Sequence, residues 1–225
     1  MAMATAADAR TDAQIQRDVL AELEWDARVR PNEIGVAVKD GVVTLLGWVD
    51  SYPKKWAAEE AAHRVRGVLA VANDLEVRLA GGAERTDPDL AAAAARALAW
   101  NALLPGEEID VTVAKGWVAL KGEVEWQFKR EEGERAVRNL MGVRGVINQI
   151  AVKPRSIPSG LKENIEEALR RNAHAAAARI TVGVQGGRVI LKGTVRTRAE
   201  RDDAERVAWS APGVTSVETR IAISD

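Results

Sequence analysis

Apolar residues follow the same order three times along the 225-residue chain. In the first copy, large apolar residues alternate with smaller ones over residues 34–38, which is the pattern of a strand with one buried face. The Asp40-Gly41 dipeptide and a second alternating run come next, as in a hairpin with a tight turn. Gly41 returns as Gly116 and Gly187, so the copies are offset by 116 − 41 = 75 and 187 − 116 = 71 residues. Both offsets hold without gaps, and the chain is therefore predicted to be a tandem repeat. The repeated positions of the first strand are Ile34, Val36, Val38, then Ile109, Val111, Val113, then Ile180, Val182, Val184.

Two stretches of each copy have the spacing of an amphipathic helix instead. The first is predicted to begin at Thr11 or Thr86, whose hydroxyl suits an N-cap, with Gln14 or Asp89 three residues later. The second is predicted to begin after Ser51. The buried stripes of the first helix are expected to be Ile15, Val19, Leu23, then Leu90, Ala94, Leu98, then Leu161, Ile165, Leu169.

Each copy thus reads helix, strand, strand, helix, strand, which predicts the α+β class. Both helices need a surface to cover, so they are expected on one face of a small three-stranded mixed sheet. A right-handed crossover would make the third strand parallel to the second. The predicted modules span residues 11–79, 86–153 and 157–224.

Glycines recur at three stations of every copy and are interpreted as structural. The first station suits the hairpin turn, and the second falls on the core-facing side of strand two, where a helix could approach or a bulge could form. The third is interpreted as a left-handed C-cap that ends the second helix. The stations hold Gly41, Gly116, Gly187, then Gly47, Gly122, Gly193, then Gly67, Gly142, Gly213.

Composition narrows the class of function. The formal charge is −1 and no segment is strongly basic, so nucleic acid is not expected as a partner. The chain has no cysteine and no apolar run near the ~20 residues that span a bilayer. The first ten residues lack the features of a secretory signal. A cytoplasmic location is expected, or a periplasmic one if an upstream signal has been removed.

No catalytic constellation stands out. The two histidines, His63 and His174, do not repeat between copies, and the common nucleotide, hydrolase and zinc-protease motifs are absent. Carboxylates in the helices are mixed with Lys and Arg, as on a solvated face. The sequence therefore predicts neither an enzyme nor a cofactor or metal site. These carboxylates include Glu59, Glu60, Glu131, Glu132 and Glu134.

The aromatic residues depart from the repeat and are the best candidates for binding. Trp25 and Trp100 are equivalent at the end of the first helix, but the third copy has Arg171, so this position is expected to be partly exposed. Other aromatics gather with cations after strand two in the first two copies, where the third copy is polar. The candidate surface comprises Trp48, Tyr52, Lys54, Lys55 and Trp56, with Trp126, Phe128, Lys129 and Arg130.

The hairpin glycine, the V-x-L-x-G-x-V run, the alanine-rich helix and the G-V-x-x-V run together resemble the BON domain (bacterial OsmY and nodulation) three times. The resemblance implies the αββαβ fold, a link to osmotic stress or transport, and binding to phospholipid surfaces or other proteins. Trp beside Lys or Arg is typical of both membrane interfaces and protein interfaces. Three interpretations stay open: a protein partner, a phospholipid surface, and packing of aromatics within or between modules.

Overall fold

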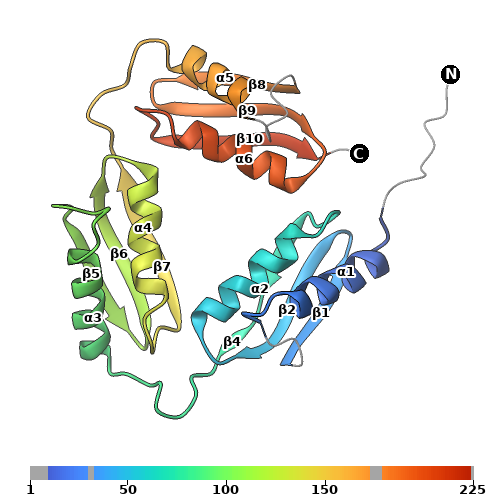
Figure 1. Ribbon diagram of the computed structural model, residues 1–225, viewed down its shortest axis with the longest axis vertical. Helices are drawn as coiled ribbons and strands as arrows, with labels where there is room; N and C mark the ends of the chain where they lie inside the picture. Colours follow the sequence, from blue (N-terminus) through green and yellow to red (C-terminus); the bar gives the residue numbers. More distant parts are fainter. Residues whose placement is uncertain (1–9, 30–32, 173–178, 224–225) are drawn as a thin grey trace. The chain divides into compact units, whose positions relative to one another are not determined.

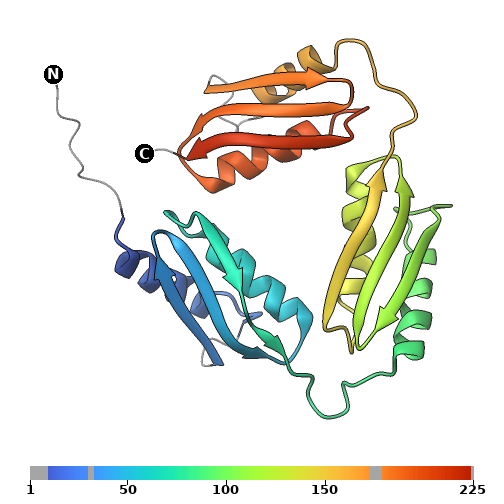
Figure 2. The same cartoon turned by 180° about the vertical axis from the view of Figure 1, so that it is seen from behind.

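The computed structural model describes residues 10–29, 33–172 and 179–223. It contains three αββαβ modules in chain order, which confirms the predicted fold class (Figures 1 and 2). The first module has α1 (Asp12–Trp25), β1 (Ile34–Lys39), β2 (Val42–Val49), α2 (Tyr52–Arg64), β3 (Ala70–Asn73) and β4 (Glu76–Val77). The second has α3 (Asp87–Ala99), β5 (Ile109–Ala114), β6 (Trp117–Val124), α4 (Gln127–Arg138) and β7 (Gly145–Val152). The third has α5 (Leu161–Arg171), β8 (Ile180–Gln185), β9 (Arg188–Val195), α6 (Arg198–Trp209) and β10 (Ser216–Ile223).

Each sheet has its second strand in the centre. In the second module β5 pairs with β6 in the antiparallel sense and β7 pairs with β6 in the parallel sense, and the other modules repeat this arrangement. Both helices of a module cover the same face of its sheet (Figure 1), and the view from behind shows the other face, which we call the open face (Figure 2). The parallel third strand predicted from the crossover is confirmed.

The core of each module lies between its helices and its sheet. The predicted stripe Ile15, Val19 and Leu23 is buried in the first module, and the corresponding residues of α3 and α5 are buried as well. From the sheet, Leu45, Leu120 and Leu191 point into these cores and are fully buried. The predicted N-caps are present too, because the Thr11 and Thr86 hydroxyls accept hydrogen bonds from the backbone N–H groups of Gln14 and Asp89.

The third strand of the first module is interrupted, which the repeat did not predict. Its two parts, β3 and β4, keep one register along β2, since Leu45 faces Asn73 and Trp48 faces Glu76. The break lies opposite Gly47, whose φ of +113° takes β2 out of regular strand geometry. Leu75, inside the break, still reaches the core and is 2% exposed.

Two predictions about the glycines need correction. A helix was one expected neighbour of Gly122. Instead, a Cβ there would lie 2.5 Å from the backbone oxygen of Glu108, so the backbone just before β5 leaves no room for a side chain. Gly142 has a positive φ of 98° as predicted, yet it does not cap α4, because that helix ends four residues earlier at Arg138. Gly47 and Gly193 repeat the first finding, and Gly67 and Gly213 repeat the second.

The hairpin turns are also of two kinds. Asp40 and Gly41 both have positive φ, as do Lys115 and Gly116, which fits the tight turn predicted from the sequence. In the third module Gly186 takes that conformation and Gly187 does not. Glycine is still required at position 187 for space, since a Cβ would lie 2.6 Å from the backbone oxygen of Gly213.

A carboxylate ties the first helix to the hairpin turn in two of the modules. The Asp87 carboxylate accepts hydrogen bonds from the backbone N–H groups of Lys115 and Gly116, at 2.8 and 2.9 Å. Asp12 does the same for Asp40 and Gly41, at 2.9 and 3.0 Å. We call this contact the aspartate clasp. The third module has Pro158 at the equivalent position, so it lacks that carboxylate.

The chain divides into two compact units, one that ends at Ala80 and one that begins at Gly81. The boundaries of the three modules remain predictions. Among the helices that the structure describes, none is sufficiently long and apolar to span a bilayer.

Candidate binding surface

The aromatic cluster predicted in the first module is distributed over two layers. Trp48 alternates with the buried Val49 on β2 and therefore lies on the open face, where the Arg78 guanidinium is 5.8 Å from its ring centroid. Tyr52 and Trp56 belong to α2, which covers the opposite face. All three are half-buried. As a single binding surface this group remains a proposal, and its members lie on different faces of the sheet.

The cations of the same cluster make contacts inside the module. Lys54 forms an ion pair with Asp50, with 2.6 Å between Nζ and Oδ2. The backbone oxygen of Lys55 accepts a hydrogen bond from the Asn73 side chain, which also donates to Glu59. The contacts of Asn73 tie α2 to the sheet, and the Lys54 side chain is paired within the module, whereas Lys55 takes part through its backbone oxygen alone.

The second module shows the same division of roles. Lys129 pairs with Glu107 at 2.5 Å, and both side chains are less than a fifth exposed. Arg130 donates to the backbone oxygen of Asn148 at 3.3 Å. Trp126 is the N-cap residue of α4 and is half-buried, whereas Phe128 is 49% exposed. Of the four candidate residues, Phe128 is the one that is exposed, whereas the other three are half-buried.

The most exposed aromatics are Trp25 and Trp100, which the candidate surface did not include. The exposed fractions of these two residues are 85% and 89%. Tryptophan has a large aromatic ring that usually contributes to a protein core or an interface. They occupy equivalent positions, at the last residue of α1 and at the C-cap of α3. In the sequence, the exchange of these tryptophans for Arg171 in the third copy predicted that the position is partly exposed. It did not show how large the exposed fraction is. We call Trp25 and Trp100 the terminal tryptophans.

The chain next to Trp25 is fixed by charges. Asp26, with a side chain only 9% exposed, accepts hydrogen bonds from the guanidinium groups of Arg28 and Arg64, and Arg64 also pairs with Glu22. The hydrogen bond from the Arg28 side chain is the main cause that lowers the pKa of Asp26 well below its usual range, against the opposing effect of desolvation. This network joins the end of α1 to the end of α2.

The chain next to Trp100 is fixed by an amide instead. Asn101, at the position of Asp26, donates to the Glu132 carboxylate at 3.0 Å and accepts from the backbone N–H of Leu103 at 2.9 Å. The Lys129–Glu107 pair fastens the same loop to α4 further along. Both terminal tryptophans therefore project from a helix end that is followed by an anchored residue. Leu103, three residues after Trp100, is 50% exposed and is a further apolar residue of this loop.

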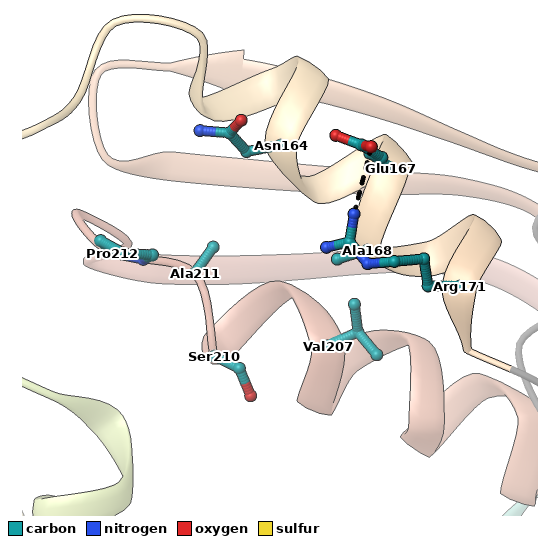
Figure 3. A pocket seen from close by; sticks show the side chains of 8 residues that line it. All are labelled: Asn164, Glu167, Ala168, Arg171, Val207, Ser210, Ala211 and Pro212. Atoms are coloured by element: carbon teal, nitrogen blue, oxygen red, sulfur yellow. Dashed lines mark ion pairs between the residues drawn. The ribbon is translucent and has the colours of Figure 1, made fainter.

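The third module has a groove beside the position that is equivalent to the terminal tryptophans. The groove has a volume of about 420 Å³ and lies between α5 and the end of α6, as Figure 3 shows. Arg171, the counterpart of the terminal tryptophans, lines it and pairs with Glu167 at 3.3 Å. The other lining residues are Asn164, Ala168, Val207, Ser210, Ala211 and Pro212. This mixture of small, polar and paired groups provides no nucleophile with an adjacent base.

The residues considered for chemistry are dispersed. His63 lies on α2 and is half-buried, while His174 lies outside the described residues. Glu59 and Glu134 accept hydrogen bonds from Asn73 and Asn148 on the third strands, so they are not simply solvated as the sequence suggested. Within the described parts of the chain, no three His, Asp or Glu side chains gather as metal ligands would.

Comparison with known proteins identifies the family to which the chain belongs. The family model described as "BON domain" matches residues 11–78, 86–154 and 159–225. Osmotically-inducible protein Y of Escherichia coli (strain K12) is 30% identical over 147 residues, which are 63% of this chain and 73% of that protein. The three BON-domain matches cover the repeated helices, strands and glycines described above.

Similarity to solved structures is much weaker. CdsD, a structural protein of the type III secretion system of Chlamydia trachomatis, is 12% identical with a TM-score of 0.26, over 92% of this chain and 91% of that one. The periplasmic domain of PrgH is 12% identical with a TM-score of 0.22, over 92% and 100%. Likeness at this level carries no argument about function.

Proposed function

The chain belongs to the BON domain family, and from that premise we propose that it is a non-catalytic binding or scaffolding protein, linked to osmotic stress, that docks a protein partner. The link to osmotic stress rests on the name of the Escherichia coli relative. The proposed docking residues are the terminal tryptophans, with Phe128 and Leu103 as further apolar surface in the second module.

The observation that carries the proposal is the exposure of Trp25 and Trp100 at equivalent positions, 85% and 89%. Exposed tryptophans on a fixed backbone are typical of interface hot spots, because a large ring held in this way loses little entropy when a partner buries it. The hydrophobic core of a module does not require tryptophan at this position, since the third module folds with Arg171 there.

A phospholipid surface is the second candidate. Tryptophan is favoured at the level of lipid headgroups, so the terminal tryptophans would suit a membrane surface as well. Anionic lipids also require cations directed outward. Lys54, Lys129 and Arg130 make contacts inside their own modules, which favours the protein partner over the lipid.

The test is a double variant, Trp25→Arg with Trp100→Arg, in the full chain. The third module already folds with arginine at this position, so the variant is expected to keep its secondary structure by circular dichroism. Tagged protein is used to capture partners from osmotically stressed cells, and it is floated in parallel with phosphatidylglycerol–phosphatidylethanolamine vesicles. We expect the yield of a captured partner to fall at least ~10-fold, as for the loss of hot-spot residues.

The matched control is Arg171→Ala, which changes the equivalent position of the third module and should leave capture unchanged. If the double variant loses vesicle binding and no protein is captured specifically, the phospholipid surface replaces the protein partner. If neither capture nor flotation changes, the terminal tryptophans do not bind and the proposal is wrong.

A further inference from the structure

The outer edge of β5 has unpaired backbone groups. β5 is an edge strand, and its ladder with β6 closes at the Ala114–Trp117 pair around a two-residue turn. Residues of an antiparallel ladder point their N–H and C=O alternately toward the partner strand and away from it. Counted from that closing pair, Ile109, Val111 and Val113 point their backbone groups outward.

The first module shows how such an edge can be covered. Val36 of β1 is the counterpart of Val111, and its outward oxygen accepts a hydrogen bond from the Gln16 side chain of α1 at 2.7 Å. This contact confirms that the position faces outward. It also occupies an acceptor that an incoming strand would need, which is a common way to protect an edge.

The flank of the first helix beside this edge differs between the modules. In the third module Lys162 and Glu166 stand there as an ion pair with 3.7 Å between Nζ and Oε1. In the second module every position of the flank is alanine, so no side chain is long enough to reach the edge of β5. The equivalent sets are Gln16, Leu20, Glu24, then Ala91, Ala95, Ala99, then Lys162, Glu166, Arg170.

Two backbone groups on the opposite edge of the same sheet have side-chain partners. The Asn148 side chain of β7 accepts from the backbone N–H of Ile150 at 3.2 Å, and Arg130 donates to the backbone oxygen of Asn148. The second module therefore covers part of its β7 edge and leaves its β5 edge accessible.

We propose that β5 binds an extended segment of a partner protein as an added strand, a mode in which main-chain hydrogen bonds provide affinity. On the helix side, the segment would place bulky apolar side chains against Ala91 and Ala95, where short side chains leave room. On the open-face side, it would place Lys or Arg beside Asp110 and Glu108, which are exposed. The third module has Thr181 and Arg179 there, so this charge preference belongs to the second module.

The probe for the test is a fluorescein-labelled ten-residue peptide in which Val or Leu alternates with Lys or Thr. Its partner probe has the same sequence with every second amide N-methylated, which keeps the side chains but removes the donors for an added strand. Fluorescence anisotropy with the full chain measures affinity, and hydrogen exchange locates the site. We expect the plain probe to bind and to slow exchange over 109–114, and the methylated probe not to bind.

The variant Ala91→Gln gives the second module the side chain that covers β1 in the first. We expect it to weaken the plain probe at least ~10-fold, because the side-chain amide would compete for the Val111 oxygen. Trp25→Arg, which lies in another module, should leave the affinity unchanged, so this test does not depend on the terminal tryptophans. Equal binding of the two probes, equal affinity of Ala91→Gln, or no saturable binding of the plain probe would each overturn the proposal.

Discussion

The first helices of the second and third modules bury matching stripes but begin and end differently. α3 starts with Asp87, which clasps the hairpin turn, and ends at the exposed Trp100. α5 is preceded by Pro158 instead and ends at Arg171, which pairs with Glu167. The stripes match because both modules need the same core. The residues named at the two ends do not belong to these buried stripes, and it is at these ends that the two modules differ.

The largest expected effect concerns what all the modules share. Gly122→Ala should destabilise the second module by about 3 kcal/mol, because the position has a φ of +146° and a Cβ would lie 2.5 Å from the Glu108 oxygen. Hydrogen-exchange mass spectrometry resolves the modules and would show faster exchange in β5 and β6. Gly81→Ala is the control, since nothing lies within 4 Å of a Cβ there. Equal protection in both variants would show that the backbone yields at Gly122.

The next effect tests whether the aspartate clasp distinguishes the modules. Asp87→Ala should destabilise the second module by about 2 kcal/mol, because two backbone N–H groups lose a charged acceptor. The loss should appear as faster exchange in the α3 and hairpin peptides. Glu108→Ala, which removes an exposed carboxylate of the same module, should leave exchange unchanged. A clasp variant as stable as wild type would mean that the turn holds without it, as in the third module.

A smaller effect contrasts the charged and the amide closures. The folded-state pKa of Asp26 lies below its unfolded value, so the network stabilises the first module at neutral pH. That stabilisation is lost as the pH falls below about 4 and through the folded-state pKa. Protection of α1 and α2 should therefore decrease between pH 6 and pH 3, relative to unstructured reference peptides.

Asp26→Asn provides the matched control, because Asn101 already occupies this position in the second module. The variant should be less protected than wild type at pH 6 and should change less on acidification. Identical pH dependence in the two proteins would show that Asp26 does not stabilise the first module through its charge.

Much of the fold could be predicted from the sequence, because the strongest constraints repeat. The buried stripes, the N-caps at Thr11 and Thr86 and the parallel third strand follow from periodicity and short-range chemistry. The end of α4 was misplaced, since a glycine with positive φ can serve a later turn as well as a helix cap. The interrupted third strand of the first module was not predicted, because the repeat pattern is the same there as in the second and third modules, whose third strands are continuous.

The candidate surface was harder to predict, because exposure depends on contacts between distant residues. Lys129 stands beside Phe128 in sequence, yet its ammonium group meets Glu107, more than twenty residues away. Trp48 and Trp56 are close in sequence, but β2 and α2 place them on different faces of the sheet. The repeat did contain a signal for Trp25 and Trp100 in their exchange for Arg171, and only the structure shows how fully both rings are exposed.

The most direct test of the proposed function is photo-cross-linking from the terminal tryptophans in living cells. Benzoylphenylalanine replaces Trp25 or Trp100 in the full chain, and cells are irradiated before and after an osmotic upshift. We predict that both positions form a cross-link to the same partner protein, and that benzoylphenylalanine at Arg171 does not. Absence of any protein cross-link from Trp25 and Trp100, with Arg171 equally silent, would contradict the proposed docking role.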